Sequence, residues 1–295
     1  MKTITSVSTV SAECISARKS GKTIGFVPTM GFLHEGHLSL IRLARQKADV
    51  VVVSIFVNPT QFGPGEDFDK YPRDMDRDAA MCSSAGVDIL FCPDASDMYT
   101  QGHSVFVDEE MVSESLCGLL RPGHFKGVLT VVAKLFHLVQ PDFAVFGQKD
   151  LQQCRLVQKM VRELDFQVRI EVAPIVREDD GLAMSSRNVY LSSAERCAAV
   201  CVPGSLALAG DMLESGVDDV DEIRRRMREL IGRTQVASID YIEFLDYQTW
   251  KPVKMVRGQC AIVMAVRIGK VRLLDNIMIG GDAGQRVFLP RSLPR

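Results

Sequence analysis

The stretch IGFVPTMGFLHEGH, Ile24 to His37, decides the fold and points to a site. Its apolar part, Ile24 to Val27, ends at a proline and is typical of a buried strand of a parallel sheet. Gly36 opens an amphipathic stretch, which predicts a helix. Helix N-termini attract anions because their backbone N–H groups are unpaired, and residues three apart share a face. We therefore predict a phosphate-binding turn where His34 and His37 point toward one ligand.

Strand-like and helix-like stretches alternate through the first half of the chain. The expected strands are Ile24–Val27, Val50–Val57, Val87–Cys92 and Phe143–Phe146, and the expected helices are Gly36–Lys47, Asp74–Ala85 and Gly127–Val139. Such alternation predicts an α/β fold with a Rossmann-like doubly wound parallel sheet. Ligands of such sheets gather at the carboxyl ends of the strands.

The character of the chain changes near Arg177. The helical stretches Ala194–Leu213 and Val220–Ile231 are followed by two strand-like stretches, Ile239–Asp246 and Cys260–Ile268. This order predicts a smaller α+β C-terminal domain, so we place the domain boundary between residues 176 and 177. The tail after Ile279 matches no recognisable pattern.

Composition excludes several function classes. With 295 residues, 46% hydrophobic residues, 24% charged residues and a net charge of −2, the chain is typical of a soluble globular protein. Dispersed Lys and Arg argue against nucleic-acid binding, and no segment suggests a membrane span or a signal peptide, so we expect a cytoplasmic protein. The eight cysteines form no CxxC pair, as expected of reduced thiols. Histidines that bind zinc from a helix are normally four apart, so the three-residue spacing disfavours a metal site, and metal ligands stay unknown.

The short motif HEGH resembles the HxGH signature of the nucleotidyltransferase superfamily. The longer PTMGFLHEGH is similar to the pantothenate synthetase family, the ATP-dependent ligases of pantoate and β-alanine. HEGH alone is a weak signal, because a loop histidine and a half-buried one can stand three apart by chance. The resemblance continues, in the family's order, in NPTQF, GQKD and SSRN. It is dense from Ile24 to Leu191 and looser through Ile239–Asp246.

These further motifs each allow a structural alternative. Asn58 and Gln61 offer amide groups on a loop, where they either bind substrate or cap the turn. Lys149 supplies a compact positive charge for phosphate oxygens, and Asp150 fits a helix N-cap equally well. Two serines and Arg187 can wrap a triphosphate, although SSRN also suits a helix start. The acidic stretch 65–74 is expected to be a lid, with Tyr71 and Arg73 as contact residues. Arg121, His124 and Lys126 could contact substrate, and His124 fits a loop residue equally well.

The resemblance implies site residues of three kinds. The implied catalytic residues are His37, His34, Lys149, Ser185 and Arg187. Those implied to bind ATP are Met30, Gly31, Phe32, Leu33, His34, Glu35, Gly36, His37, Gly147, Gln148, Lys149, Asp150, Val176, Met184, Ser185, Ser186 and Arg187. Those implied to bind pantoate or β-alanine are Gln61, Gln153 and Asn58.

The resemblance also implies the activity and its partners. Pantoate and ATP would form a pantoyl adenylate, and β-alanine would displace AMP from it without an enzyme nucleophile. Mg²⁺ is expected to accompany ATP, since it binds mainly through phosphates and waters. Residues 1–176 would bind nucleotide and pantoate, residues 177–295 would form a lid, and the enzyme would be a homodimer. The rival classes are a nucleotidyltransferase with a phosphate acceptor and a non-catalytic ATP sensor.

Overall fold

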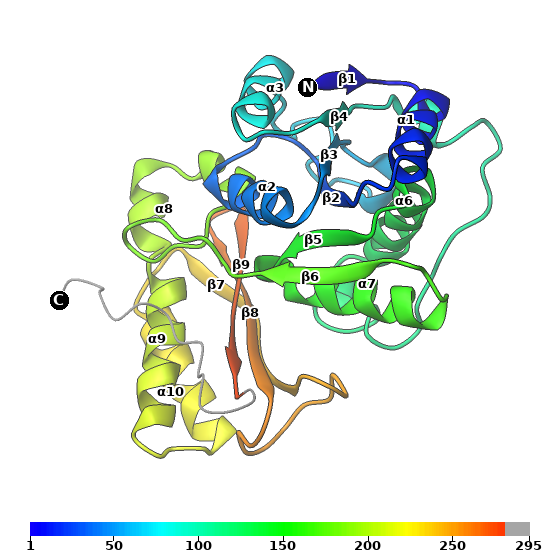
Figure 1. Cartoon of the computed structure of the whole chain (residues 1–295). Coiled ribbons are helices and arrows are strands. Elements are labelled where there is room, and N and C mark those ends of the chain that lie inside the picture. Colours follow the sequence, from blue (N-terminus) through cyan, green and yellow to red (C-terminus); the bar gives the residue numbers. More distant parts are fainter. Residues whose placement is uncertain (281–295) are drawn as a thin grey trace. The chain divides into compact units, whose positions relative to one another are not determined.

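The computed structural model describes residues 1–280, and the chain divides into two compact units (Figure 1). The first consists of Met1–Gln148 and Gln152–Pro174, and the second consists of Lys149–Leu151 and the chain from Ile175 onward. Each unit has its own hydrophobic core. The tail without an assigned role lies, from residue 281 on, outside the described residues.

The first unit is built on a six-stranded sheet whose order is β1-β4-β3-β2-β5-β6 and whose neighbours all run parallel. Its strands are β1 (Lys2–Ile4), β2 (Ile24–Thr29), β3 (Val50–Ile55), β4 (Ile89–Phe91), β5 (Phe143–Gly147) and β6 (Arg169–Ala173). Its helices are α1 (Val7–Lys19), α2 (Glu35–Lys47), η1 (Pro59–Gln61), α3 (Met75–Ser84), α4 (Ala95–Met98), α5 (Cys117–Leu120), α6 (His124–Val139) and α7 (Leu151–Glu163). A short helix, η2 (Gln148–Asp150), leads from β5 into α7.

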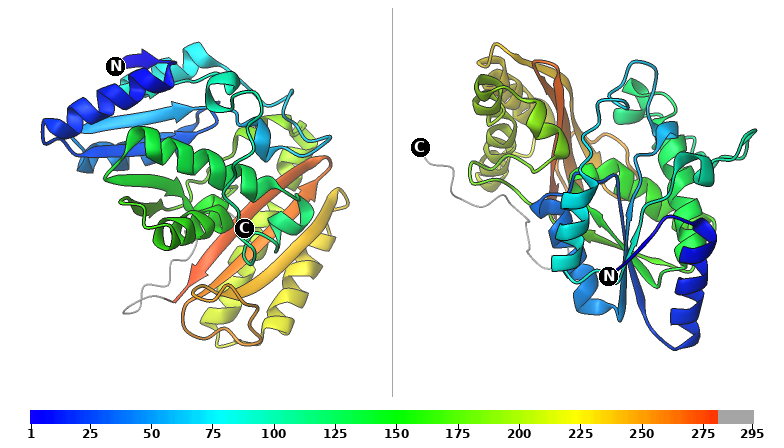
Figure 2. Two further views of the ribbon diagram at one scale, coloured as in Figure 1. Left: turned by 90° about the vertical axis from the view of Figure 1, so that its right-hand side faces the viewer. Right: turned by 90° about the horizontal axis from the view of Figure 1, so that it is seen from above.

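Helices cover both faces of this sheet, so the predicted doubly wound architecture is confirmed. Helices α2 and α3 lie on one face, and α1, α6 and α7 lie on the other (Figure 2). The chain moves from β2 to β3 and β4 in one direction, and from β5 to β6 in the other. The sheet therefore has its switch point between β2 and β5, where parallel α/β folds bind ligands.

The second unit contains a three-stranded antiparallel sheet in the order β7-β8-β9. The elements are η3 (Ser186–Tyr190), α8 (Ser193–Ala198), α9 (Cys201–Glu214), α10 (Val220–Gly232), β7 (Ala237–Asp246), β8 (Cys260–Ile268) and β9 (Val271–Ile279). Apolar side chains of α9 and α10 share one core with the strands. The expected smaller α+β fold is confirmed. The chain's one tryptophan, Trp250, is 6% exposed in this unit and has a left-handed backbone with φ of 58°.

One expectation about Ala194–Leu213 needs correction. The single helix is wrong, because the chain turns at Ala199–Val200 between α8 and α9. Pro203 explains the turn, since its ring would clash with the carbonyl four residues earlier in a continuous helix. By length and composition alone, the stretch Ser193–Glu214 could span a membrane, since an 18-residue window in it has a mean hydropathy of 1.3; 44% of that window is buried, as in a core helix of a protein without a membrane span.

Candidate active site

The turn after β2 has a strained backbone that a buried carboxylate holds in place. Gly31 has φ of 85°, and Phe32 has φ of 50°, which is uncommon for a residue with a side chain. The carboxylate of Asp78, 1% exposed on α3, accepts hydrogen bonds from the amides of Phe32 at 2.6 Å and Leu33 at 2.8 Å. Burial raises the pKa of Asp78 above its usual value, although the two backbone hydrogen bonds oppose that rise. Sequence reasoning missed Asp78, because an acidic residue in the first turns of a helix is ordinary.

His34 and His37 lie together at the start of α2. His34 is the N-cap residue, and its Nδ1 accepts from the amide of Gly36 at 3.1 Å. The Nδ1 of His37 accepts from the amide of His34 at 3.3 Å, and the two ring centroids are 4.1 Å apart. In the neutral form of each ring, the proton lies on the nitrogen that does not accept, which is Nε2. The helix begins at Glu35, one residue before the predicted start.

The neighbours of this pair differ in what they can offer a ligand. The side chain of Leu33 is completely buried in the core, so only its backbone could bind anything. Glu35 forms an ion pair with Arg42 on the same helix. The ring of Phe32 lies 5.2 Å from the guanidinium of Arg77.

Asn58 and Gln61 form a second cluster beyond the end of β3. Asn58 is fully buried, and its Nδ2 donates to Gln61 Oε1 at 3.2 Å and to the carbonyl of Gly127 at 3.1 Å. Asn58 also caps η1 by accepting from the amide of Thr60, so the structural alternative applies to it. The Nε2 of Gln61 donates to Met30 Sδ at 2.8 Å, which joins this cluster to the turn after β2.

Arg121 and His124 hold the loop that carries Gln61. His124 Nδ1 lies 2.8 Å from the carbonyl of Gln61, and that carbonyl can only accept. Arg121 makes two hydrogen bonds of 2.6 Å with the carboxylate of Glu66 in the expected lid stretch. Burial raises the pKa of Glu66, but the hydrogen bond and charge of Arg121 lower it by more, so the net pKa lies below its usual value. Tyr71, an expected contact residue, is 5% exposed and packs on Phe62.

Gly147, Gln148 and Gln153 lie around the end of β5. Gly147 is the last residue of β5, the strand that neighbours β2, and Gln148 follows it, at the switch point of the sheet. Gln153 is half-buried in the first turn of α7. The adjacent Gln152 has a different task, because its amide holds the loop at Val112 and Ser115.

In the second unit, Lys149 is anchored through its backbone. Its carbonyl accepts from Nδ2 of Asn276 on β9 at 3.1 Å, and its ammonium is 3.5 Å from a carboxylate oxygen of Asp150. Asn276 is 2% exposed and follows Asp275, which forms a buried ion pair with Arg177 at 2.7 Å. Asp275 and Asn276 were not predicted, because polar residues inside an apolar strand interrupt its sequence pattern.

The SSRN segment starts a short helix. The amide of Met184 donates to the carbonyl of Val176 at 3.0 Å, which closes the preceding loop. Ser185 is the N-cap of η3 and accepts from the amide of Arg187 at 3.3 Å. The alternative that SSRN marks a helix start is therefore confirmed, and a ligand role for Ser185 would come in addition to it. Ser186 is 7% exposed.

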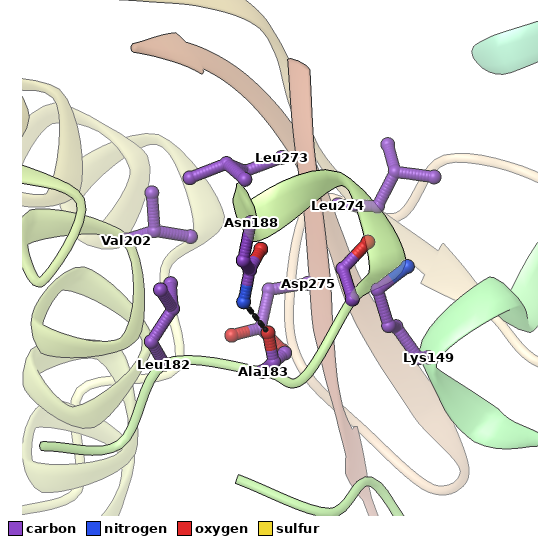
Figure 3. A pocket seen from close by; sticks show the side chains of 9 residues that line it. Lys149, Leu182, Ala183, Asn188, Val202, Leu273, Leu274 and Asp275 are labelled. Carbon is purple, nitrogen blue, oxygen red and sulfur yellow. Dashed lines mark hydrogen bonds between the residues drawn. The ribbon is translucent and has the colours of Figure 1, made fainter. Parts of the chain in front are cut away.

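A small pocket in the second unit contains two of the predicted residues, Lys149 and Ser185 (Figure 3). Asn188 lines the same pocket; its Nδ2 donates to the carbonyl of Ala183 at 3.1 Å, and its buried Oδ1 has no hydrogen-bond partner within residues 1–280. The structure thus groups His34 with His37, Asn58 with Gln61 and Met30, and Lys149 with Ser185.

Comparison with known proteins decides the family. The family model described as pantoate-beta-alanine ligase matches residues 2–278. The chain belongs to the pantoate-beta-alanine ligase family. It is 52% identical to a pantothenate synthetase of Heliobacterium modesticaldum, over 95% of this chain and 99% of that protein. It is 53% identical to one of Thermosipho melanesiensis, over 88% of this chain and 93% of that protein.

Solved structures agree with this membership of the pantoate-beta-alanine ligase family. A pantothenate synthetase of Thermus thermophilus has a TM-score of 0.89 at 42% identity, covering 94% of this chain and 99% of that one. A pantoate-beta-alanine ligase of Francisella tularensis has a TM-score of 0.77 at 34% identity, covering 94% of this chain and 97% of that one, and its crystals held beta-gamma ATP and beta-alanine. The ligase activity and the role in pantothenate biosynthesis follow from this membership.

Proposed function

We propose that this ligase condenses (R)-pantoate with β-alanine in two steps at the expense of ATP. A carboxylate oxygen of pantoate attacks the α-phosphorus of ATP, and the bond to the leaving diphosphate breaks. The amine of β-alanine then attacks the acyl carbon of the pantoyl adenylate, loses a proton, and displaces AMP. No enzyme nucleophile takes part, so the site acts by positioning and by stabilising charge.

The observation that carries this proposal is the pair of imidazoles at the start of α2. Both rings lie at a helix N-terminus and have Nδ1 occupied by backbone amides, so Nε2 carries the proton in the neutral form of each ring. Two fixed donors at the positive end of a helix dipole suit phosphate oxygens on which negative charge develops. The same occupation of Nδ1 disfavours His37 as a general base toward the ammonium of β-alanine.

The remaining roles follow the charges and hydrogen-bonding groups of each motif. Lys149 would stabilise charge at the phosphates, and Ser185, Ser186 and Arg187 would bind the leaving diphosphate. Gln61 and Gln153 would bind pantoate, with Asn58 in support. For the other ATP contacts, we propose the same residues that the resemblance implies. Among them, residues 30–37 form the turn after β2 and the start of α2. The lid role of residues 177–295 stays a prediction.

The proposal also covers the metal ion, the cellular location and the oligomeric state. Within residues 1–280, no cluster of three or more His, Cys, Asp or Glu could hold a metal ion. We propose that Mg²⁺ arrives with the triphosphate and keeps several of its waters. We also propose a cytoplasmic homodimer.

The test is exchange of labelled pyrophosphate into ATP. Exchange should require pantoate and should not require β-alanine, because only the first step is reversed. A ligase that activated the acid by another route would show no pantoate-dependent exchange. In an enzyme with a phosphate acceptor, exchange would not depend on pantoate. An ATP sensor would show no exchange.

A further inference from the structure

The orientation of the Asn58 amide is fixed by two backbone groups. The carbonyl of Gly127, 3.1 Å from Nδ2, can only accept a hydrogen bond. The amide of Thr60, 3.4 Å from Oδ1, can only donate one. Amide oxygen and nitrogen are alike in shape, so their partners decide which is which. Nδ2 of Asn58 therefore faces α6, and Oδ1 faces η1.

This orientation determines how Gln61 is turned. The second hydrogen of Asn58 Nδ2 points to Gln61 Oε1 at 3.2 Å, so that oxygen is already used as an acceptor. The amino group of Gln61 consequently faces the other way, where Nε2 lies 2.8 Å from Met30 Sδ. A thioether is a weak acceptor, so a substrate oxygen can replace it. The Gln61 side chain is buried, with 8% of its surface exposed.

Tyr99 contacts Asn58 from outside the loop, and we call the hydrogen-bonded series Tyr99–Asn58–Gln61 the relay. Tyr99 directly follows α4. Its hydroxyl donates to Asn58 Oδ1 at 2.9 Å and lies 3.2 Å from Thr60 Oγ1. Thr60 Oγ1 itself donates to Asn58 Oδ1 at 3.0 Å. Burial raises the pKa of the Tyr99 phenol, although the hydrogen bonds with Thr60 and Asn58 oppose the rise. The hydroxyl thus keeps its proton at neutral pH and remains a donor.

We propose that Tyr99 is a positioning residue that acts through Asn58, and that the relay presents Gln61 to the acid substrate as a hydrogen-bond donor. This subsite would then recognise an acceptor oxygen of the hydroxy acid, either a carboxylate oxygen or a hydroxyl lone pair. The inference rests on the proposed function, because it specifies how Gln61 selects the acid.

Two substitutions of Gln61 test the polarity of the subsite. Gln61→Glu keeps the acceptor for Asn58 but has no donor, whereas Gln61→Leu has neither. If Gln61 acts as a donor, KM for pantoate should rise at least about tenfold in Gln61→Leu and no less in Gln61→Glu. A Gln61→Glu enzyme that keeps more affinity for pantoate than Gln61→Leu would overturn the proposal. Two pantoate analogues, each lacking one hydroxyl, identify the oxygen that Gln61 contacts. If Gln61 contacts a hydroxyl, Gln61→Leu should not raise KM further for the analogue that lacks that hydroxyl. If Gln61→Leu raises KM for both analogues as much as for pantoate, Gln61 contacts the carboxylate.

Tyr99→Phe tests the positioning role, since it removes one hydroxyl and keeps the ring. We expect KM for pantoate to rise about threefold to tenfold while kcat and KM for ATP stay unchanged. Tyr247→Phe, in the second unit, is the matched control and should leave all three unchanged. A lower melting temperature of Tyr99→Phe with an unchanged KM for pantoate would reduce Tyr99 to a structural residue. A wild-type enzyme without pantoate-dependent exchange would refute the proposed function instead.

Discussion

His34 has two tasks that can be separated by substitution. Its Nδ1 caps α2, and we propose that its Nε2–H donates to a phosphate. His34→Ala loses both, so the free energy of unfolding should fall by about 1 kcal/mol and kcat by about 100-fold. His34→Asn, a strong N-cap, should regain the stability in a denaturant titration but not the activity. Activity that returned with the cap would show that His34 is only structural.

His37 should matter for the first step alone. His37→Ala should lower overall turnover by about 100-fold, the typical cost of losing one preorganised donor. Amide formation from preformed pantoyl adenylate and β-alanine should stay within a few-fold of wild type, because Nδ1 of His37 is already occupied and cannot act as base. Single-turnover measurement of that step decides the question. A loss as large as that of overall turnover would make His37 a catalyst of both steps.

At the residue scale, the sequence predicted which residues belong to the motifs but not what supports them. His34, His37, Asn58 and Gln61 were recognisable because they stand within short, specific motifs. Asp78 and Tyr99 lie 44 and 38 positions after His34 and Gln61 in ordinary surroundings. Hydrogen bonds over such separations depend on tertiary packing, which a local pattern does not contain.

Helix α6 approaches η1 so closely that Gly127 has no room for a side chain. A Cβ there would lie 2.3 Å from the carbonyl oxygen of Thr60 and 2.7 Å from Cα of Gln61. Gly127→Ala should therefore destabilise the protein and raise KM for pantoate, although alanine favours helices by roughly 0.5–1 kcal/mol. Gly204→Ala on α9, where nothing lies within 4 Å, is the control. Gly204→Ala should be neutral or stabilising in thermal unfolding, and equal behaviour of the two variants would contradict this view of the contact.

The ion pair between Glu66 and Arg121 should make the lid stretch sensitive to acid. The pKa of Glu66 is lowered in the folded protein, so its stabilisation is complete above its ordinary pKa of about 4.3 and is lost as the pH falls through the lower folded value. Glu66→Gln should therefore be less stable than wild type at pH 7, and this difference should shrink below about pH 4.3. Urea titrations at several pH values measure it. Glu13→Gln, which loses only an exposed pair with Lys2, should differ little from wild type throughout.

At the element scale, long periodic segments were predicted well and short or mixed ones were not. Strand β3 is buried along its whole length and is apolar except for Ser54. In contrast, β1 has three residues, and β6 contains an arginine and a glutamate. Strand β9 carries buried Asp275 and Asn276, whose partners come from distant segments.

At the scale of the whole molecule, the two units have separate cores, so we expect a substitution in one core to lower the stability of that unit alone. Removing Asp275 leaves Arg177, 9% exposed, without its charge partner, and breaking a buried pair costs about 3–5 kcal/mol. Asp275→Ala should lower the stability of the second unit by that amount in a denaturant titration followed by circular dichroism. Asp221→Ala, which breaks an ion pair whose carboxylate is 89% exposed, should change stability by less than about 0.5 kcal/mol. Equal losses in the two variants would contradict the role of the buried pair.

The position of Trp250 gives this enzyme an optical reporter of one unit. It is the chain's one tryptophan and is buried within the second unit, whereas the five tyrosines occur in both. Excitation at the red edge of protein absorption therefore selects an indole whose emission should shift to longer wavelength only when the second unit opens to water. Far-ultraviolet ellipticity reports on both units at once. Stopped-flow recording of the two signals during refolding would time the second unit against the whole chain without any introduced label.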